Sequence, residues 1–125
     1  MYRPDTLNGV DWDGPPETWL KASTVLIDFV QPLGLDHAPA RTMEDGLNIA
    51  AAVWSAVVLA DTRGDRQNLD DLLARSRRLP QMREMVEFLI ARKRASYPKD
   101  TRLMVVEGCT RVSGRIDVRV TWSMA

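Results

Sequence analysis

Two pairings of side chains in this sequence could support catalysis, and the first is a nucleophile with a base. The only histidine, His37, and the only cysteine, Cys109, would form such a pair if the fold joined them. His37 lies beside Asp36 in a proline-containing linker, which is typical of a surface residue. Cys109 lies in a strand-like segment without a neighbouring group that would activate its thiol. We therefore expect a buried, inert thiol and no catalytic residue.

A cluster of carboxylates is the second chemical candidate, because oxygen ligands suit magnesium. Its members would be Glu44, Asp45, Asp61 and Asp65. Glu44 and Asp61 lie on one expected helix, roughly 25 Å apart at 1.5 Å per residue. Asp61 and Asp65 flank Gly64, where that helix is expected to end. The spacing predicts no metal site and no cofactor, and a magnesium-dependent hydrolase using these carboxylates is the alternative.

Asp61 shares the apolar stripe of its helix with Trp54, although it lies near the helix C-terminus. A negative charge there opposes the helix dipole and requires compensation. We expect Arg63, Arg66 or backbone N–H groups of the next turn to supply it. A candidate pocket or interface would then consist of Asp61, Trp54, Arg63 and Asp65.

Basic residues are concentrated in the second half of the chain. Residues 1–64 carry 4 basic and 9 acidic side chains, and residues 65–125 carry 13 basic and 8 acidic ones. A candidate basic surface consists of Arg92, Lys93, Arg94, Arg111, Arg115 and Arg119. Nucleic-acid binding through this surface is an alternative function. The net charge of zero and the lack of a binding motif favour an ordinary solvated surface instead.

The length of 125 residues indicates a single domain, residues 1–125. Its first segment, residues 1–14, is a polar arm without the apolar run of a secretion signal. The longest apolar run, residues 47–60, is interrupted by Asn48 and Ser55 and is shorter than the roughly 20 residues of a membrane span. We therefore expect a soluble, cytoplasmic protein that does not contact membranes.

Helical periodicity predicts a helical region over residues 15–97. Pro15 and Pro16 indicate that its first helix begins there, since proline fits the first helical turn. This helix carries a broad apolar face and ends after Val30, at a segment that contains Pro32.

The second expected helix runs from Thr42 to about Thr62 and is apolar on most sides. Such a helix is buried by neighbours, so it should form the centre of a bundle. A narrow polar seam, Asn48, Ser55 and Thr62, recurs every seven residues along it.

Asp65 is expected to cap a third helix, and Pro80 to begin a fourth that ends at Tyr97. The apolar residues of the four helices recur at helical spacing and should meet in one core. The expected core residues are Trp19, Leu26, Val53, Trp54, Val57, Leu72, Val86, Leu89 and Ile90.

Residues 101–125 alternate between apolar and polar side chains, which predicts a two-stranded antiparallel hairpin. A two-residue turn at Ser113 and Gly114 would match the apolar positions poorly, so we expect a three-residue loop over 112–114. This loop pairs Thr110 with Ile116, Gly108 with Val118, Val106 with Val120, Met104 with Trp122 and Glu107 with Arg119. The predicted class is α+β, a four-helix N-terminal bundle followed by a C-terminal two-stranded antiparallel β-hairpin.

An isolated two-stranded hairpin is marginal in water, and its open edges pair readily with other strands. We therefore expect a homodimer formed through the C-terminal hairpin, which makes a four-stranded sheet from two chains. In the alternative, the arm near Leu7 to Trp12 adds a strand and leaves a monomer. Without a catalytic pattern, the expected function is a non-enzymatic binding or regulatory module, and a protein partner is compatible with it.

Overall fold

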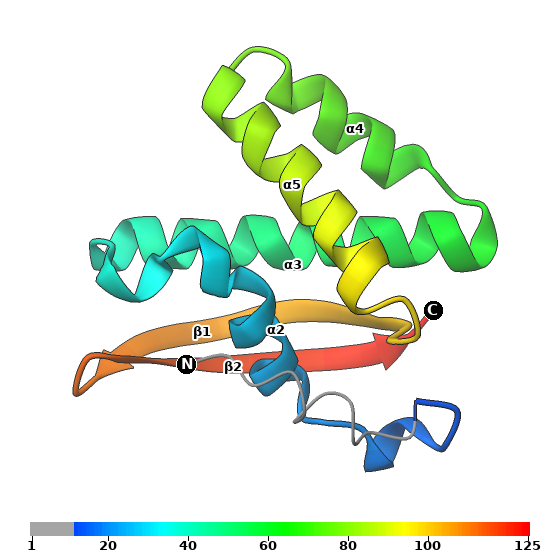
Figure 1. Ribbon diagram of the computed structural model, residues 1–125, viewed down its shortest axis with the longest axis horizontal. Helices are drawn as coiled ribbons and strands as arrows, with labels where there is room; N and C mark the ends of the chain where they lie inside the picture. The colour runs from blue at the N-terminus through cyan, green and yellow to red at the C-terminus, as the bar shows by residue number, and fades with distance from the viewer. Residues whose placement is uncertain (1–11) are drawn as a thin grey trace.

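The computed structural model describes residues 12–125, which form four α-helices followed by two strands (Figure 1). The α-helices are α2 Ala22–Val30, α3 Ala40–Arg63, α4 Gln67–Ser76 and α5 Pro80–Ser96. Short 3-10 turns occur at Pro16–Thr18, Gln31–Leu33 and Leu35–His37. The strands are β1 Arg102–Val112 and β2 Arg115–Met124, paired antiparallel. The predicted α+β class, four helices followed by a hairpin, is confirmed.

Helix α3 is the centre of the structure, as predicted. It contacts α2, α4, α5 and β1, and in Figure 1 it lies along β1 with the α4–α5 pair on its other side. By length and composition it is the one described helix that could cross a membrane, but 56% of its apolar window is buried within the fold. It ends at Gly64, whose φ of 68° gives the left-handed stop that the sequence predicts.

The first helix begins later than predicted. Residues Pro16–Thr18 form only a 3-10 turn, the chain is extended at Trp19, and α2 starts at Ala22. The cause is a tertiary contact, because the Leu20 carbonyl accepts a hydrogen bond of 2.8 Å from Arg102 Nη1. In a helix that continued from residue 15, the same carbonyl would instead accept a hydrogen bond from the N–H group four residues later.

The fourth helix begins at Pro80 as predicted, whereas the third begins one residue later than predicted, with Arg66 and not Asp65 at its N-cap. Asp65 Oδ1 accepts a hydrogen bond of 3.2 Å from the Gln67 N–H, at the start of α4. Pro80 is the first residue of α5, which ends at Ser96, directly before Tyr97. Capping residues and proline therefore predict a helix end where only neighbouring residues determine it.

Most of the expected core is buried. The buried members are Leu26, Val53, Trp54, Val57, Val86 and Leu89, whereas Trp19, Leu72 and Ile90 are partly buried. Aromatic rings surround Trp54, with centroid distances of 5.2 Å to Phe29 and 5.4 Å to Tyr97. The core thus joins α2, α3 and the end of α5.

The turn of the hairpin differs from the prediction. Ser113 and Gly114 form a two-residue turn with φ values of 51° and 77°, as a type I′ turn requires. Near the turn, the paired residues are Cys109 with Val118, Thr110 with Asp117, and Arg111 with Ile116. A β-bulge at Glu107 then adds one residue to β1, which restores the predicted pairs Val106–Val120 and Met104–Trp122.

The prediction of a three-residue loop was therefore wrong. The extra residue of the first strand lies in the bulge at Glu107 and not in the turn. The expected contact of Glu107 with Arg119 changes as well. Gly108 is now opposite Arg119, and Glu107 accepts a hydrogen bond of 2.9 Å from Thr121 Oγ1.

One face of the hairpin packs on the helices, with α3 against β1 and α2 against β2. Met104 and Val118 are buried on that face. The opposite face is exposed to solvent at Val105 and Val112. The alternative third strand near residues 7–12 lies outside the described residues, except for Trp12, whose ring centroid is 5.3 Å from that of Trp19.

Candidate functional site

A buried ion pair joins the end of α5 to the hairpin. Arg102 and Asp100 are both fully buried and form a bidentate pair, with Nη2–Oδ2 at 2.7 Å and Nε–Oδ1 at 3.0 Å. The guanidinium also lies 5.4 Å from the ring centroids of both Trp19 and Trp122. With Nη1 bound to the Leu20 carbonyl, each of the three guanidinium nitrogens donates a hydrogen bond. Its role in this arrangement is to hold three distant segments together.

Lys93 is a second buried cation. Its Nζ donates a hydrogen bond of 2.6 Å to the Tyr97 carbonyl and lies 4.6 Å from the Trp54 ring centroid. Burial lowers the pKa of Lys93 to about 8, and the charges of Asp100 and then Asp61 oppose this fall. The amine is thus closer to neutrality than a surface lysine, but it is committed to the carbonyl at the end of α5.

A third polar group links α2 to α5. The Tyr97 hydroxyl donates a hydrogen bond to Asp28, and Arg92 lies 3.7 Å from the same carboxylate. Arg92 Nε also donates to the Phe29 carbonyl at 2.9 Å. Burial raises the pKa of Asp28, while the hydrogen bond from Tyr97 and the charge of Arg92 act in the opposite direction. These bonds replace solvent at the end of α2.

The structure does not bring the six residues of the candidate basic surface together. Arg92 is partly buried and Lys93 fully buried, so both serve the interior. Arg111 donates to the Ala38 carbonyl and lies 3.8 Å from the sulfur of Met43. The members exposed to solvent are Arg94, Arg111, Arg115 and Arg119. They belong to α5, β1 and β2, so a nucleic acid would not meet all six at once.

The charge of Asp61 is compensated by Arg94, a residue 33 positions away in the sequence. Arg94 of α5 donates two hydrogen bonds to its carboxylate, at 2.9 and 3.1 Å, while Arg66 contacts Asp70 instead. Asp61 also lines a cavity of about 220 Å³ with Lys93 and other residues of α5 and the following turn. The expectation that Arg63 or Arg66 compensates Asp61 is therefore corrected.

The four residues of the candidate pocket or interface are dispersed. Trp54 is buried, and its Nε1 donates 2.7 Å to the Arg102 carbonyl. Asp61, Arg63 and Asp65 are exposed at the end of α3 and after it. The Trp54 ring, by contrast, is fully enclosed by the core.

The carboxylates of the hydrolase alternative lie at opposite ends of α3. Glu44 and Asp45 are in its first turns, and Asp61 is in its last. Within residues 12–125, no group of three or more histidine, cysteine, aspartate or glutamate side chains is arranged to hold a metal ion. The magnesium chemistry considered from the sequence therefore has no geometric support in this part of the chain.

The environments of His37 and Cys109 do not favour a catalytic pair. The His37 side chain is exposed and lies 3.5 Å from Asp36. Burial, together with the charge of Glu44, raises the pKa of the Cys109 thiol. A raised pKa reduces the thiolate fraction, which is the reactive form.

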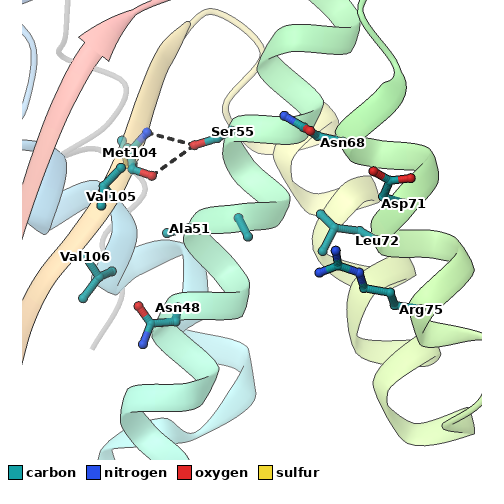
Figure 2. Close-up of a pocket in the computed structure, with 11 residues that line it drawn as sticks. Asn48, Ala51, Ser55, Asn68, Asp71, Leu72, Arg75, Met104, Val105 and Val106 are labelled. Atoms are coloured by element: carbon teal, nitrogen blue, oxygen red, sulfur yellow. Dashed lines mark hydrogen bonds between the residues drawn. The ribbon is translucent and has the colours of Figure 1, made fainter.

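A cavity of about 410 Å³ forms a groove between α3, α4 and β1 (Figure 2). Small side chains, Ala51 and Ala52, line it on α3. Polar side chains line it on α3 and α4, namely Asn48, Ser55, Asn68, Asp71 and Arg75. The polar seam of the expected central helix was the one sequence signal for this groove, since Asn48 and Ser55 belong to both.

Ser55 binds the edge of β1 inside this groove. Its Oγ accepts a hydrogen bond of 2.9 Å from the Met104 N–H and donates one of 3.1 Å to the Met104 carbonyl (Figure 2). Two residues earlier in the strand, the Arg102 carbonyl accepts a hydrogen bond from Trp54 Nε1. Helix α3 therefore occupies the outer edge of β1 over its first residues.

The outer edge of β2 has no such cover. In an antiparallel ladder, alternate residues direct both backbone groups to the same side. Since Met104 points away from β2, its partner Trp122 points away from β1, and so do Val120, Val118 and Ile116. Among residues 12–125, no hydrogen bond to another segment occupies these outward groups.

Comparisons with other proteins do not assign this site. No protein-family model, curated protein or solved structure matches the chain. The interpretation of the buried cluster, the groove and the open strand edge therefore rests on their chemistry.

Proposed function

We propose that the protein is a non-enzymatic, cytoplasmic binding module that works as a homodimer assembled through its C-terminal hairpin. The observation that carries this proposal is the asymmetry of the hairpin. Helix α3 binds the backbone of β1 at Arg102 and Met104, whereas the outer edge of β2 has no partner among the described residues. An edge of this kind pairs readily with another strand.

The distribution of apolar surface supports the hairpin as the interface. Across residues 12–125, the exposed large apolar side chains are Leu79 and Phe88 on the helical side and Val105, Val112, Trp122 and Met124 on the hairpin. Trp122 and Met124 belong to β2, the strand whose outer edge has no partner among the described residues.

The buried charges support the non-enzymatic part of the proposal. Asp100 and Arg102 neutralise each other, and the Lys93 ammonium binds a backbone carbonyl. A catalytic acid or base must reach a substrate proton, and these groups are already committed to partners in the fold. The arrangement favours stabilisation over catalysis.

Sedimentation velocity over a range of micromolar concentrations, combined with hydrogen exchange, tests the proposal. We expect a dimer, with amide protection in β2 that increases with protein concentration. Phe88→Ser is the matched control, because Phe88 is an exposed apolar side chain on α5. This variant should dimerise like the parent. A monomer at all concentrations, or concentration-dependent protection confined to α4 and α5, would contradict the proposal.

A further inference from the structure

We propose that two copies of the chain pair antiparallel along β2, about a two-fold axis at Val118, to form a continuous four-stranded sheet. This inference rests on the proposed function and specifies the surface and register through which self-association occurs. It follows from three features of β2: the direction of its backbone groups, two charges that have no partner among residues 12–125, and a groove beside it.

The backbone of β2 is arranged for this pairing. Ile116, Val118 and Val120 direct their N–H and C=O groups away from β1, by the alternation that Met104 and Ser55 define. An axis at Val118 places Val118 opposite its own copy and Ile116 opposite Val120 of the second copy. Each of these pairs exchanges two backbone hydrogen bonds, so the outward groups of three residues in each chain are satisfied.

The charges of β2 select the same register. Asp117 and Arg119 are exposed, and neither forms an ion pair or side-chain hydrogen bond among the described residues. With the axis at Val118, Asp117 lies opposite Arg119 of the second copy, and the pair occurs twice. Opposite charges directly across two strands stabilise the pairing.

Neighbouring registers lose this complementarity. An axis at Asp117 opposes two aspartates, and an axis at Arg119 opposes two arginines, so both place like charges across the strands. An axis at Val120 brings Arg119 opposite Thr121 and leaves the charges unpaired.

An axis at Ile116 is the closest competitor, because it places Arg115 opposite Asp117. It moves the contact toward the turn at Ser113 and Gly114, so fewer residues of β2 overlap. It also leaves Arg119 beyond the paired segment. The dependence on Arg115 or on Arg119 therefore separates the two registers.

A groove with apolar and polar lining at the turn end of β2 supports the axis at Val118 independently. The groove measures about 350 Å³ and is lined by Ile27, Val30, Leu35, Ile116, Gly114 and neighbouring polar residues. The register brings Trp122 of the second copy opposite Gly114, on the face that packs against α2. Trp122 is a partly exposed aromatic side chain at 37%, and this groove offers it an apolar contact.

The charge pattern permits a mixing experiment. In Asp117→Arg, arginines at 117 and 119 oppose each other in the homodimer, and in Arg119→Asp the opposed residues are all aspartates. Since two attractive charge pairs become repulsive, we expect each variant to self-associate about tenfold more weakly than the parent. A mixture of the two variants opposes Arg to Asp at every pair, so it should form a heterodimer of near-parental affinity. Arg115→Asp is the control and should change the affinity little.

A pair of proline substitutions tests the edge itself. Val106 and Val120 face each other across the hairpin, and both direct their N–H groups outward. Proline at either position therefore leaves the β1–β2 hydrogen bonds in place. Val120→Pro should abolish the dimer, and Val106→Pro, on the opposite edge, should preserve it. Circular dichroism checks folding, and we expect the helical signal of the parent in both variants.

The outcomes separate the two proposals. If Val120→Pro and the charge variants dimerise as strongly as the parent, the proposed self-association stands. Pairing along β2 is then overturned. A dimer abolished by Val120→Pro, but without heterodimer formation in the mixture, overturns the register at Val118. A parental protein that is monomeric throughout the micromolar range overturns both proposals.

Discussion

The Ser55 hydroxyl lies between the N–H and the carbonyl of Met104, at 2.9 and 3.1 Å, and occupies the place of a neighbouring strand. A single side chain of α3 thereby satisfies a backbone position at the edge of β1. The other edge of the sheet, on β2, has no equivalent residue within the described part of the chain. This difference between the two edges underlies the proposed homodimer.

Ser55→Ala should destabilise the protein by about 1–3 kcal/mol, because two backbone groups of Met104 lose their partner in a poorly solvated position. Urea denaturation measures the change. Ser123→Ala is the control, since Ser123 is exposed on β2 and its removal should stay within about 0.5 kcal/mol. Equal stability of the two variants would show that the Ser55 bonds contribute nothing.

The buried and the exposed ion pair should differ strongly. Asp100→Asn leaves the buried Arg102 guanidinium without its counter-charge, and we expect a loss of about 3–5 kcal/mol. Asp61→Asn weakens a pair whose side chains are 46% and 44% exposed, and we expect a loss below about 1 kcal/mol. Thermal or urea unfolding compares them, and similar losses would contradict the structural role of the Asp100–Arg102 pair.

Lys93 should make stability depend on alkaline pH. Burial lowers its pKa from 10.5 to about 8 in the folded state, so between these values the unfolded chain binds more protons. The free energy of unfolding contributed by Lys93 therefore increases as the pH rises from about 8 to 10.5. Below about pH 8 both states are protonated, and the burial penalty is fully present.

Lys93→Met isolates this contribution, since methionine is a similar unbranched side chain without the charge. We expect the difference in unfolding free energy between parent and variant to change over the interval from pH 8 to pH 10.5 and to be constant below it. A difference that is constant over the whole range would show that Lys93 titrates as an ordinary surface lysine.

Magnesium should leave the melting temperature unchanged, because Glu44 and Asp45 lie at the opposite end of α3 from Asp61. Differential scanning fluorimetry with and without the ion makes this comparison. A magnesium-dependent rise in melting temperature that Asp61→Asn abolishes would instead support the hydrolase alternative.

The helices were predictable from local signals. Their boundaries depend on residues within a few positions, namely Gly64, Asp65 and Pro80. The apolar residues around Trp54 in the sequence indicate a central helix. The start of α2 was not predictable in this way. The contact that limits it joins Leu20 to Arg102, which is 82 residues away.

The site was less accessible from sequence for a related reason. Arg102 begins a strand and Lys93 lies near a helix end, both positions where exposed cations are common. Their burial depends on Trp19, Trp54 and Trp122 from distant segments. The bulge at Glu107 was hidden because an extra residue in a strand and an extra residue in a turn change the alternation of apolar residues in the same way.

The most direct test of the homodimer is an isotope-filtered nuclear Overhauser measurement on a dimer mixed from labelled and unlabelled chains. With the two-fold axis at Val118, Asp117 and Arg119 of the second copy form a pair without mutual backbone hydrogen bonds, in which the Cα atoms approach most closely. We expect an intermolecular contact between the Hα protons of Asp117 and Arg119. A dimer without any intermolecular contact along β2, or contacts that join only helical residues, would contradict it.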